Sequence, residues 1–129
     1  MLKIAGLYVV NRDGDSVKVD IPEDCMAVQM GECCQIVTGG ILQATPHCVR
    51  GAVPVPGSGI KIARISHPCF IDTAPYFTLD APKGTSREQT CAGADYRVPP
   101  LDKRWLDDGM EFGEFLKKTF QLYYEHTTK

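Results

Sequence analysis

The chain has 129 residues, of which 43% are hydrophobic and 23% are charged, a composition typical of one globular domain. Sixteen acidic against fourteen basic residues give a net charge of -2, so the chain offers no positive field for a nucleic-acid backbone or an anionic membrane. We therefore expect neither a nucleic-acid partner nor a membrane partner.

The start of the chain and its cysteines indicate the compartment. The first residues, MLKIAGLYVVNRDGD, lack the charged-then-apolar plan of a signal peptide, and the apolar stretches are short. Six cysteines without a secretory signal favour free thiols over a disulfide scaffold. Cys33 and Cys34 would point to opposite faces of a strand, which is poor geometry for a zinc ion. The sequence predicts a cytoplasmic protein with buried, unreactive cysteines.

The first seventy residues read as short strands separated by turn signals, the pattern of a sandwich or barrel. Residues 4–10 and 16–21 are strand-like and flank NRDGD, which has Asp-Gly turn chemistry, so a hairpin is predicted there. Further strands are expected over residues 25–30, 33–38, 41–50 and 60–71, separated by glycine turns and by the Pro/Gly loop 51–59.

The second half of the chain has a different pattern. Residues 72–109 are rich in proline and lack periodicity, which predicts an extended segment that wraps the surface, with at most a short helix near residues 86–92. Trp105 in this segment is expected to cover the core. Residues 110–126 are predicted to form one amphipathic helix that packs on the sheet, through a stripe made of Phe112, Phe115, Leu116, Thr119, Phe120 and Tyr123.

One histidine stands behind a proline in the run QATPHCVRG. Taken alone, His47 is more often a hydrogen-bonded structural residue than a metal ligand. Arg64 and Ser66 follow in the next predicted strand, where alternation places both on one face. A guanidinium and a hydroxyl on one face can hold a carboxylate. A salt-bridging arginine beside a solvent-facing serine is the alternative.

The stretch GLYVVNRDGDSVKVDIPEDCMAVQMGECCQIVTGGILQATPHCVRG resembles the C-terminal half of the isopenicillin N synthase-like oxygenases, which depend on iron(II) and 2-oxoglutarate. That family has a GL-V-N-DG hairpin, a V--GD strand, a -TNG turn and a --T-HRV segment in the same order. Its R-S-P-F stretch is similar to RISHPCFI here. The resemblance covers roughly residues 6–71, with a weaker echo in the C-terminal helix.

The resemblance implies a double-stranded β-helix, or jelly roll, whose interior holds iron on two histidines and one carboxylate. His47 would be the second histidine ligand, and Arg64 and Ser66 would bind the distal carboxylate of 2-oxoglutarate. In that family the His-x-Asp ligands lie on strands that precede the GL-V hairpin. This chain begins at that hairpin. The other histidines, His67 and His126, are in no such motif.

The sequence thus predicts a mainly β single domain, residues 1–129, composed of a partial jelly roll (1–71), the wrapping segment (72–109) and the C-terminal helix (110–126). The predicted function is that of a truncated oxygenase-like protein, inactive as a lone chain and holding neither iron(II) nor 2-oxoglutarate by itself. Its small-molecule substrate stays unnamed.

The alternative is a non-enzymatic β module that dimerises through open sheet edges. A homo-oligomer is expected under both readings. A further possibility is a metal site built between two chains from their His47 side chains.

Overall fold

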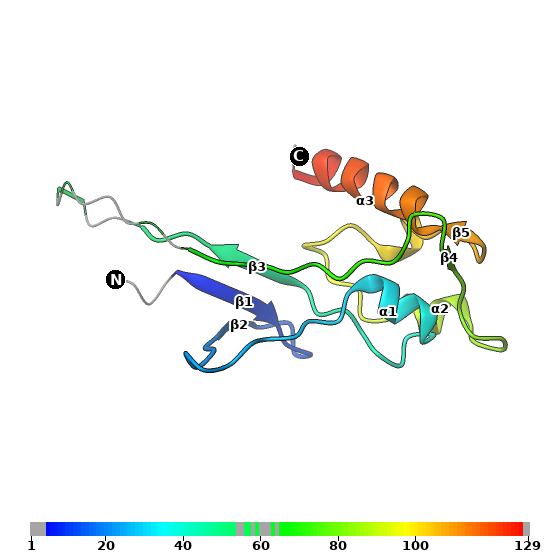
Figure 1. The fold of residues 1–129 in the computed structure, drawn as a ribbon, viewed down its shortest axis with the longest axis horizontal. Helices are drawn as coiled ribbons and strands as arrows, with labels where there is room; N and C mark the ends of the chain where they lie inside the picture. The colour runs from blue at the N-terminus through cyan, green and yellow to red at the C-terminus, as the bar shows by residue number, and fades with distance from the viewer. Residues whose placement is uncertain (1–4, 54–55, 58, 60–62, 64, 128–129) are drawn as a thin grey trace. The chain divides into compact units, whose positions relative to one another are not determined.

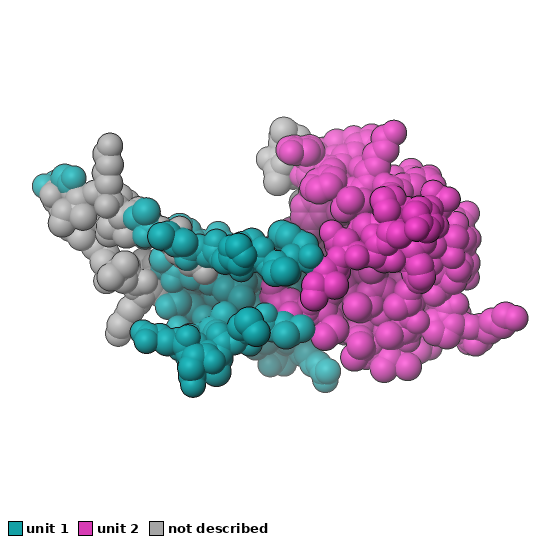
Figure 2. All heavy atoms as spheres, in the orientation of Figure 1, with its two compact units in different colours: residues 1–28, 45–70 teal, residues 29–44, 71–129 magenta. Residues whose placement is uncertain are grey.

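The computed structural model describes residues 5–53, 56–57, 59, 63 and 65–127 (Figure 1). Contacts divide the chain into two compact units, which Figure 2 shows in different colours. Unit 1 comprises Met1–Val28 and Thr45–Phe70, and unit 2 comprises Gln29–Ala44 and Ile71–Lys129. In the described part of the chain, no helix is long and apolar enough to cross a membrane.

Unit 1 begins with the predicted hairpin, which the structure confirms. Strands β1 (Gly6–Val10) and β2 (Ser16–Val19) pair in antiparallel register. The Asn11 side chain orders the turn, because its Oδ1 accepts hydrogen bonds from the backbone N–H groups of Asp13 (3.1 Å) and Asp15 (2.7 Å). Gly14 adopts a φ of +85°, which a residue with a Cβ rarely takes. Local hydrogen bonds thus order the turn of this hairpin.

Strand β3 (His47–Arg50) pairs with the other side of β1, so the sheet has the order β2-β1-β3. Directly opposite residues in antiparallel strands share a face. The register therefore places a set of aliphatic side chains on one side of the sheet, here called the aliphatic face, and a mixed set that includes Tyr8, Val10 and Lys18 on the other. The aliphatic face carries Leu7, Val9, Val17, Val19 and Val49.

Unit 2 contains the buried core of the described residues. Its elements are α1 (Glu32–Val37), β4 (Thr78–Leu79), α2 (Arg87–Thr90), the 3-10 helix η2 (Leu101–Lys103), β5 (Met110–Glu111) and α3 (Phe112–Thr127). Strands β4 and β5 pair in antiparallel register. The core consists of Ile36, Leu79, Leu101, Trp105, Met110, Phe112 and Phe115.

The strand predicted over residues 33–38 is wrong, because these residues form helix α1 and the turn that follows it. The buried Gln35 side chain supplies a reason that local sequence does not show: its Nε2 donates to the carbonyls of Thr90 (2.9 Å) and Ala92 (3.0 Å). Its Oε1 accepts from the backbone N–H of Ala44 at 2.9 Å. Distant backbone groups thereby hold a short helix in a run of strand-forming residues.

The predictions for the second half of the chain are partly confirmed. The short helix expected near residues 86–92 is α2, which Ser86 caps by accepting from the Gln89 N–H at 3.1 Å. Trp105 lies in the core as expected, and its Nε1 donates to the Leu79 carbonyl at 2.9 Å. The C-terminal helix is α3. Only part of its stripe is buried, because Leu116, Phe120 and Tyr123 remain at least one-third exposed.

The predicted mainly β fold with a partial jelly roll is wrong. The described residues form one three-stranded and one two-stranded sheet together with helices. Residues 25–30 are irregular, and the strand predicted over 41–50 begins at His47. In the strand predicted over 60–71, residues 63 and 65–71 have no regular structure, while 60–62 and 64 lie outside the described residues. Irregular and helical backbone therefore replaces several of the predicted strands.

Candidate functional site

His47 is the first residue of β3 and lies opposite Val9 of β1. Val9 in turn lies opposite Val17 of β2, so a cross-strand row runs Val17, Val9, His47 on the aliphatic face. The imidazole is exposed. An exposed imidazole that shares a face with branched aliphatic side chains is therefore the best candidate in unit 1 for a side chain with a chemical role.

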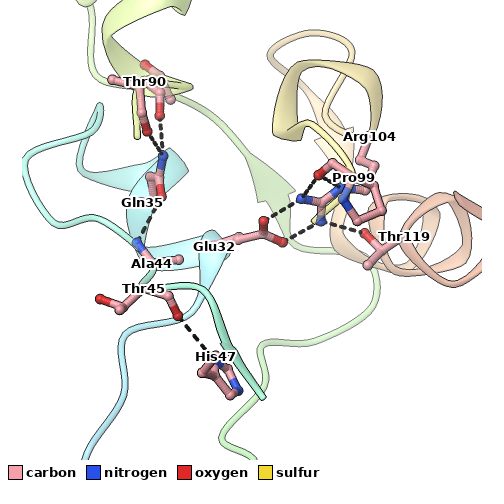
Figure 3. A network of polar contacts seen from close by, with 10 residues as sticks. Glu32, Gln35, Ala44, Thr45, His47, Thr90, Pro99, Arg104 and Thr119 are labelled. Carbon is pink, nitrogen blue, oxygen red and sulfur yellow. Dashed lines mark hydrogen bonds and ion pairs between the residues drawn. The ribbon is translucent and has the colours of Figure 1, made fainter. Parts of the chain in front are cut away.

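The hydrogen bond of His47 determines which nitrogen can act as a ligand. Nδ1 lies 3.1 Å from the backbone carbonyl oxygen of Thr45, as Figure 3 shows. A carbonyl can only accept, so Nδ1 carries the proton, and the lone pair of the neutral ring is on Nε2. Among the residues that the structure describes, Nε2 has no hydrogen-bond partner. A backbone carbonyl on one ring nitrogen and an open second nitrogen are typical of metal-binding histidines.

Of the other two predicted site residues, the structure describes Ser66 alone. Arg64 lies outside the described residues. Ser66 is exposed in a stretch without regular structure, so strand alternation gives no support for its sharing a face with Arg64. The assignment of a 2-oxoglutarate carboxylate to Arg64 and Ser66 stays a prediction.

The described residues match an iron(II) site at one position. His47 offers an imidazole nitrogen, a ligand type that suits iron. No group of three His, Cys, Asp or Glu side chains that could hold a metal ion occurs in the part of the chain that the structure describes. One ligand therefore fits, and the set of three that a facial triad needs does not form there.

Unit 2 contains a buried arginine that the sequence analysis missed. The Arg104 guanidinium forms an ion pair with Glu32 and donates to the Pro99 carbonyl from Nε (3.1 Å) and Nη2 (2.8 Å), as Figure 3 shows. Its Cζ lies 5.8 Å from the centroid of the Phe115 ring and 5.7 Å from the centroid of the Tyr123 ring. These contacts use its donors within the protein, which indicates a structural role. Neighbouring sequence carries no signal for the pair, because Glu32 is distant in the chain.

Neither of the two cysteines that pack against the core of unit 2, Cys33 and Cys91, has an activated thiol. All six cysteines are free, as predicted, but the prediction that they are buried is wrong for the four that are exposed: Cys25, Cys34, Cys48 and Cys69. Burial raises the pKa of the Cys33 thiol to about 11, and nearby acidic groups add to this effect. Burial also raises the pKa of Cys91. Because the thiolate is the nucleophile, both shifts make these two thiols less reactive.

Comparison with known proteins adds no relative. No family model, no curated protein and no solved structure matches the chain.

Proposed function

We propose that His47 is one ligand of an iron(II) site of the 2-oxoglutarate oxygenase type, and that the chain alone does not complete this site. The observation that carries the proposal is the Nδ1 hydrogen bond to the Thr45 carbonyl, which leaves Nε2 as the open nitrogen. The jelly roll predicted from the sequence is no part of this proposal, which depends on the local geometry of β3.

The neighbours of His47 in the sheet leave its second ring nitrogen open. Val9 and Val17 occupy the same row of the aliphatic face, and neither can hydrogen-bond the ring. The ring is exposed, so Nε2 is accessible from solvent.

The expected inactivity of the lone chain rests on the ligands found among the described residues. A single neutral imidazole competes poorly with water for iron(II), since a facial triad works through three ligands held together. Weak cosubstrate binding by Arg64 and Ser66 is compatible with this, because an arginine and a hydroxyl can hold one carboxylate without a metal.

The proposed inactivity is tested by assaying succinate release from 2-oxoglutarate with iron(II) and ascorbate. We expect no release above a control without protein. His67→Ala is the matched control for His47→Ala, because both residues are exposed histidines of unit 1. Release that is lost in His47→Ala and kept in His67→Ala would contradict the inactive state and show that the site is completed.

A second function, self-association without catalysis, is favoured by the aliphatic face. No described residue of unit 1 is buried, and Val17 and Val49 are 45% and 59% exposed. In the described sheet β2 and β3 are the outer strands, so each offers backbone groups for pairing with another copy. A pairing of two copies would enlarge the sheet and cover aliphatic surface.

Sedimentation over a wide concentration range tests self-association. We expect a dimer that dissociates on dilution and that Val49→Lys abolishes. Cys48→Lys places the same charge on the adjacent residue of β3, on the opposite face, and should leave the dimer intact if the aliphatic face is the contact. A monomer at every concentration would exclude this second function.

A further inference from the structure

Hydrogen bonding to β1 determines which backbone groups of β3 point away from the sheet. The Val10 N–H donates to the Pro46 carbonyl at 2.9 Å, so the backbone of Pro46 faces β1. In an antiparallel ladder, residues whose N–H and C=O face the neighbouring strand alternate with residues whose groups face away from it. Cys48 therefore also faces β1, whereas the N–H and C=O groups of His47 and Val49 point to the open side of β3.

This open side of β3 is a self-complementary pairing edge. Strand β3 is an outer strand of the described sheet, and all four of its residues are exposed. Two antiparallel copies of β3 can place His47 of each copy opposite Val49 of the other. Each such pair exchanges two backbone hydrogen bonds, so the two pairs use every outward group of these residues. Unpaired donors and acceptors on an outer strand are the groups through which a strand of another chain is added.

The other outer strand, β2, is less suited to pairing. The Asn11 N–H donates to the Asp15 carbonyl at 2.9 Å, so by the same alternation Lys18 directs its backbone groups outward. A lysine on an outer strand opposes pairing with another chain. The outward-facing residues of β3, His47 and Val49, include no lysine, arginine or acid.

The side chains and the length of β3 favour one register for this pairing. A register centred on His47 would place two titratable rings directly opposite each other. A register centred on Val49 would extend the ladder beyond Arg50, where β3 ends. With Cys48 at the centre, Arg50 lies opposite Pro46 of the other copy, and no two like charges face each other. The backbone of Pro46 faces β1, so its missing N–H costs this new ladder nothing.

We propose that β3 is the contact between two copies of this chain, which pair antiparallel about a two-fold axis between their Cys48 residues. The inference rests on the self-association proposed above, and it names the strand and the register. The two three-stranded sheets join into one, with both aliphatic faces on the same side. Each Cys48 then occupies a non-hydrogen-bonded position opposite its counterpart, with the two Cα atoms about 4.5 Å apart. Thiols at this separation can form a disulfide.

Cross-linking with diamide, which accepts the two electrons and two protons that a pair of thiols loses, tests this register. In the full chain, three exposed cysteines are first replaced by serine, so that Cys48 is the exposed thiol that remains: Cys25, Cys34 and Cys69. The protein is oxidised at a concentration that gives the dimer in sedimentation, and mass spectrometry identifies the linked peptides. We expect a Cys48–Cys48 disulfide that forms at least about 10-fold faster than random collision allows, because paired strands give the thiols a high effective concentration.

Two control variants set the scale for this rate. The first keeps Cys69 in place of Cys48, because both thiols are exposed in unit 1, and its rate measures random collision. The second combines Cys48→Ser with Val49→Cys, which moves the thiol by one residue to the other face of β3. In the proposed register position 49 lies opposite His47, so this variant should cross-link more slowly than Cys48.

Cys48→Lys gives a readout that needs no oxidant. Pairing of the β3 edges places two lysines directly opposite each other, so the dissociation constant of the dimer should rise about 2- to 5-fold. Cys69→Lys should leave it unchanged. A contact through the aliphatic face alone would leave the dimer of Cys48→Lys intact, and that result would overturn the inference.

The cross-linking outcomes separate this inference from the self-association on which it rests. A dimer in which Cys48 reacts no faster than Cys69, or more slowly than the thiol of Val49→Cys, would overturn the β3 contact centred on Cys48 while self-association stands. A monomer at every concentration would instead overturn self-association itself.

Discussion

The carboxylate of Glu32 on α1 accepts hydrogen bonds from two guanidinium nitrogens of Arg104, a residue 72 positions later in the chain. The Arg104 side chain is 1% exposed and that of Glu32 is 27% exposed. Because a buried guanidinium cannot lose its charge, Glu32 is the group that makes this burial tolerable. The pair joins α1 to the segment that follows η2 within unit 2.

Glu32→Gln should therefore destabilise the protein strongly. Removing one partner of a buried ion pair leaves an uncompensated charge, and the partial exposure of Glu32 reduces the cost to about 2–4 kcal/mol. Denaturant unfolding of wild type and variant measures the difference. Asp102→Asn is the matched control, because Asp102 forms an exposed pair with Lys103 at 3.8 Å and should cost less than about 1 kcal/mol. Equal effects would contradict a structural role for the buried pair.

Gly40 is required where α1 ends. Its φ is +83°, and a Cβ there would lie 2.3 Å from the Gln89 carbonyl oxygen. Gly84, also in unit 2, has a similar φ of +88° with nothing within 4 Å of an added Cβ. Gly84→Ala should cost about 1–2 kcal/mol for the backbone conformation alone. Gly40→Ala should cost clearly more in the same unfolding experiment, and a cost no larger than that of Gly84→Ala would argue against this close approach.

Alkylation should distinguish the Cys33 thiol from its exposed neighbour Cys34. Raising the Cys33 pKa from 9.0 to about 11 lowers its thiolate fraction at pH 8 about 100-fold. We expect slow iodoacetamide labelling of Cys33, detected by peptide mass spectrometry, with a rate that climbs as the pH approaches 11. In guanidinium chloride, where burial is lost, Cys33 and Cys34 should react at similar rates. Equal rates in the folded protein would contradict the half-buried position of Cys33.

Local chemistry made part of this structure predictable from the sequence. The turn at Asn11 and Gly14 orders itself through hydrogen bonds between near neighbours, so the hairpin could be predicted. The Ser86 cap is likewise a local signal. In contrast, Gln35 is held by Thr90, which is 55 residues away. No pattern of period two or 3.6 within six residues could reveal that contact, so CCQIVT resembled a strand.

The candidate site, too, could be predicted only where its contacts are local in the sequence. The sequence singled out His47, and its Nδ1 contact involves a residue only two positions away. Whether Ser66 reaches the same site depends on strand pairing across a long loop, and the described part of that segment is irregular. Arg104 was missed because only the fold shows that a charge in DKRW is buried.

Titration with iron(II) under anaerobic conditions, followed by NMR of the histidine rings, tests the central claim most directly. Paramagnetic iron broadens the resonances of the groups that it approaches. We predict broadening of the His47 ring at lower iron(II) concentrations than for His67, loss of this selective effect in His47→Ala, and no iron retained after gel filtration, as expected for one ligand. Equal broadening of His47 and His67 throughout the titration would contradict the assignment of His47 as an iron ligand.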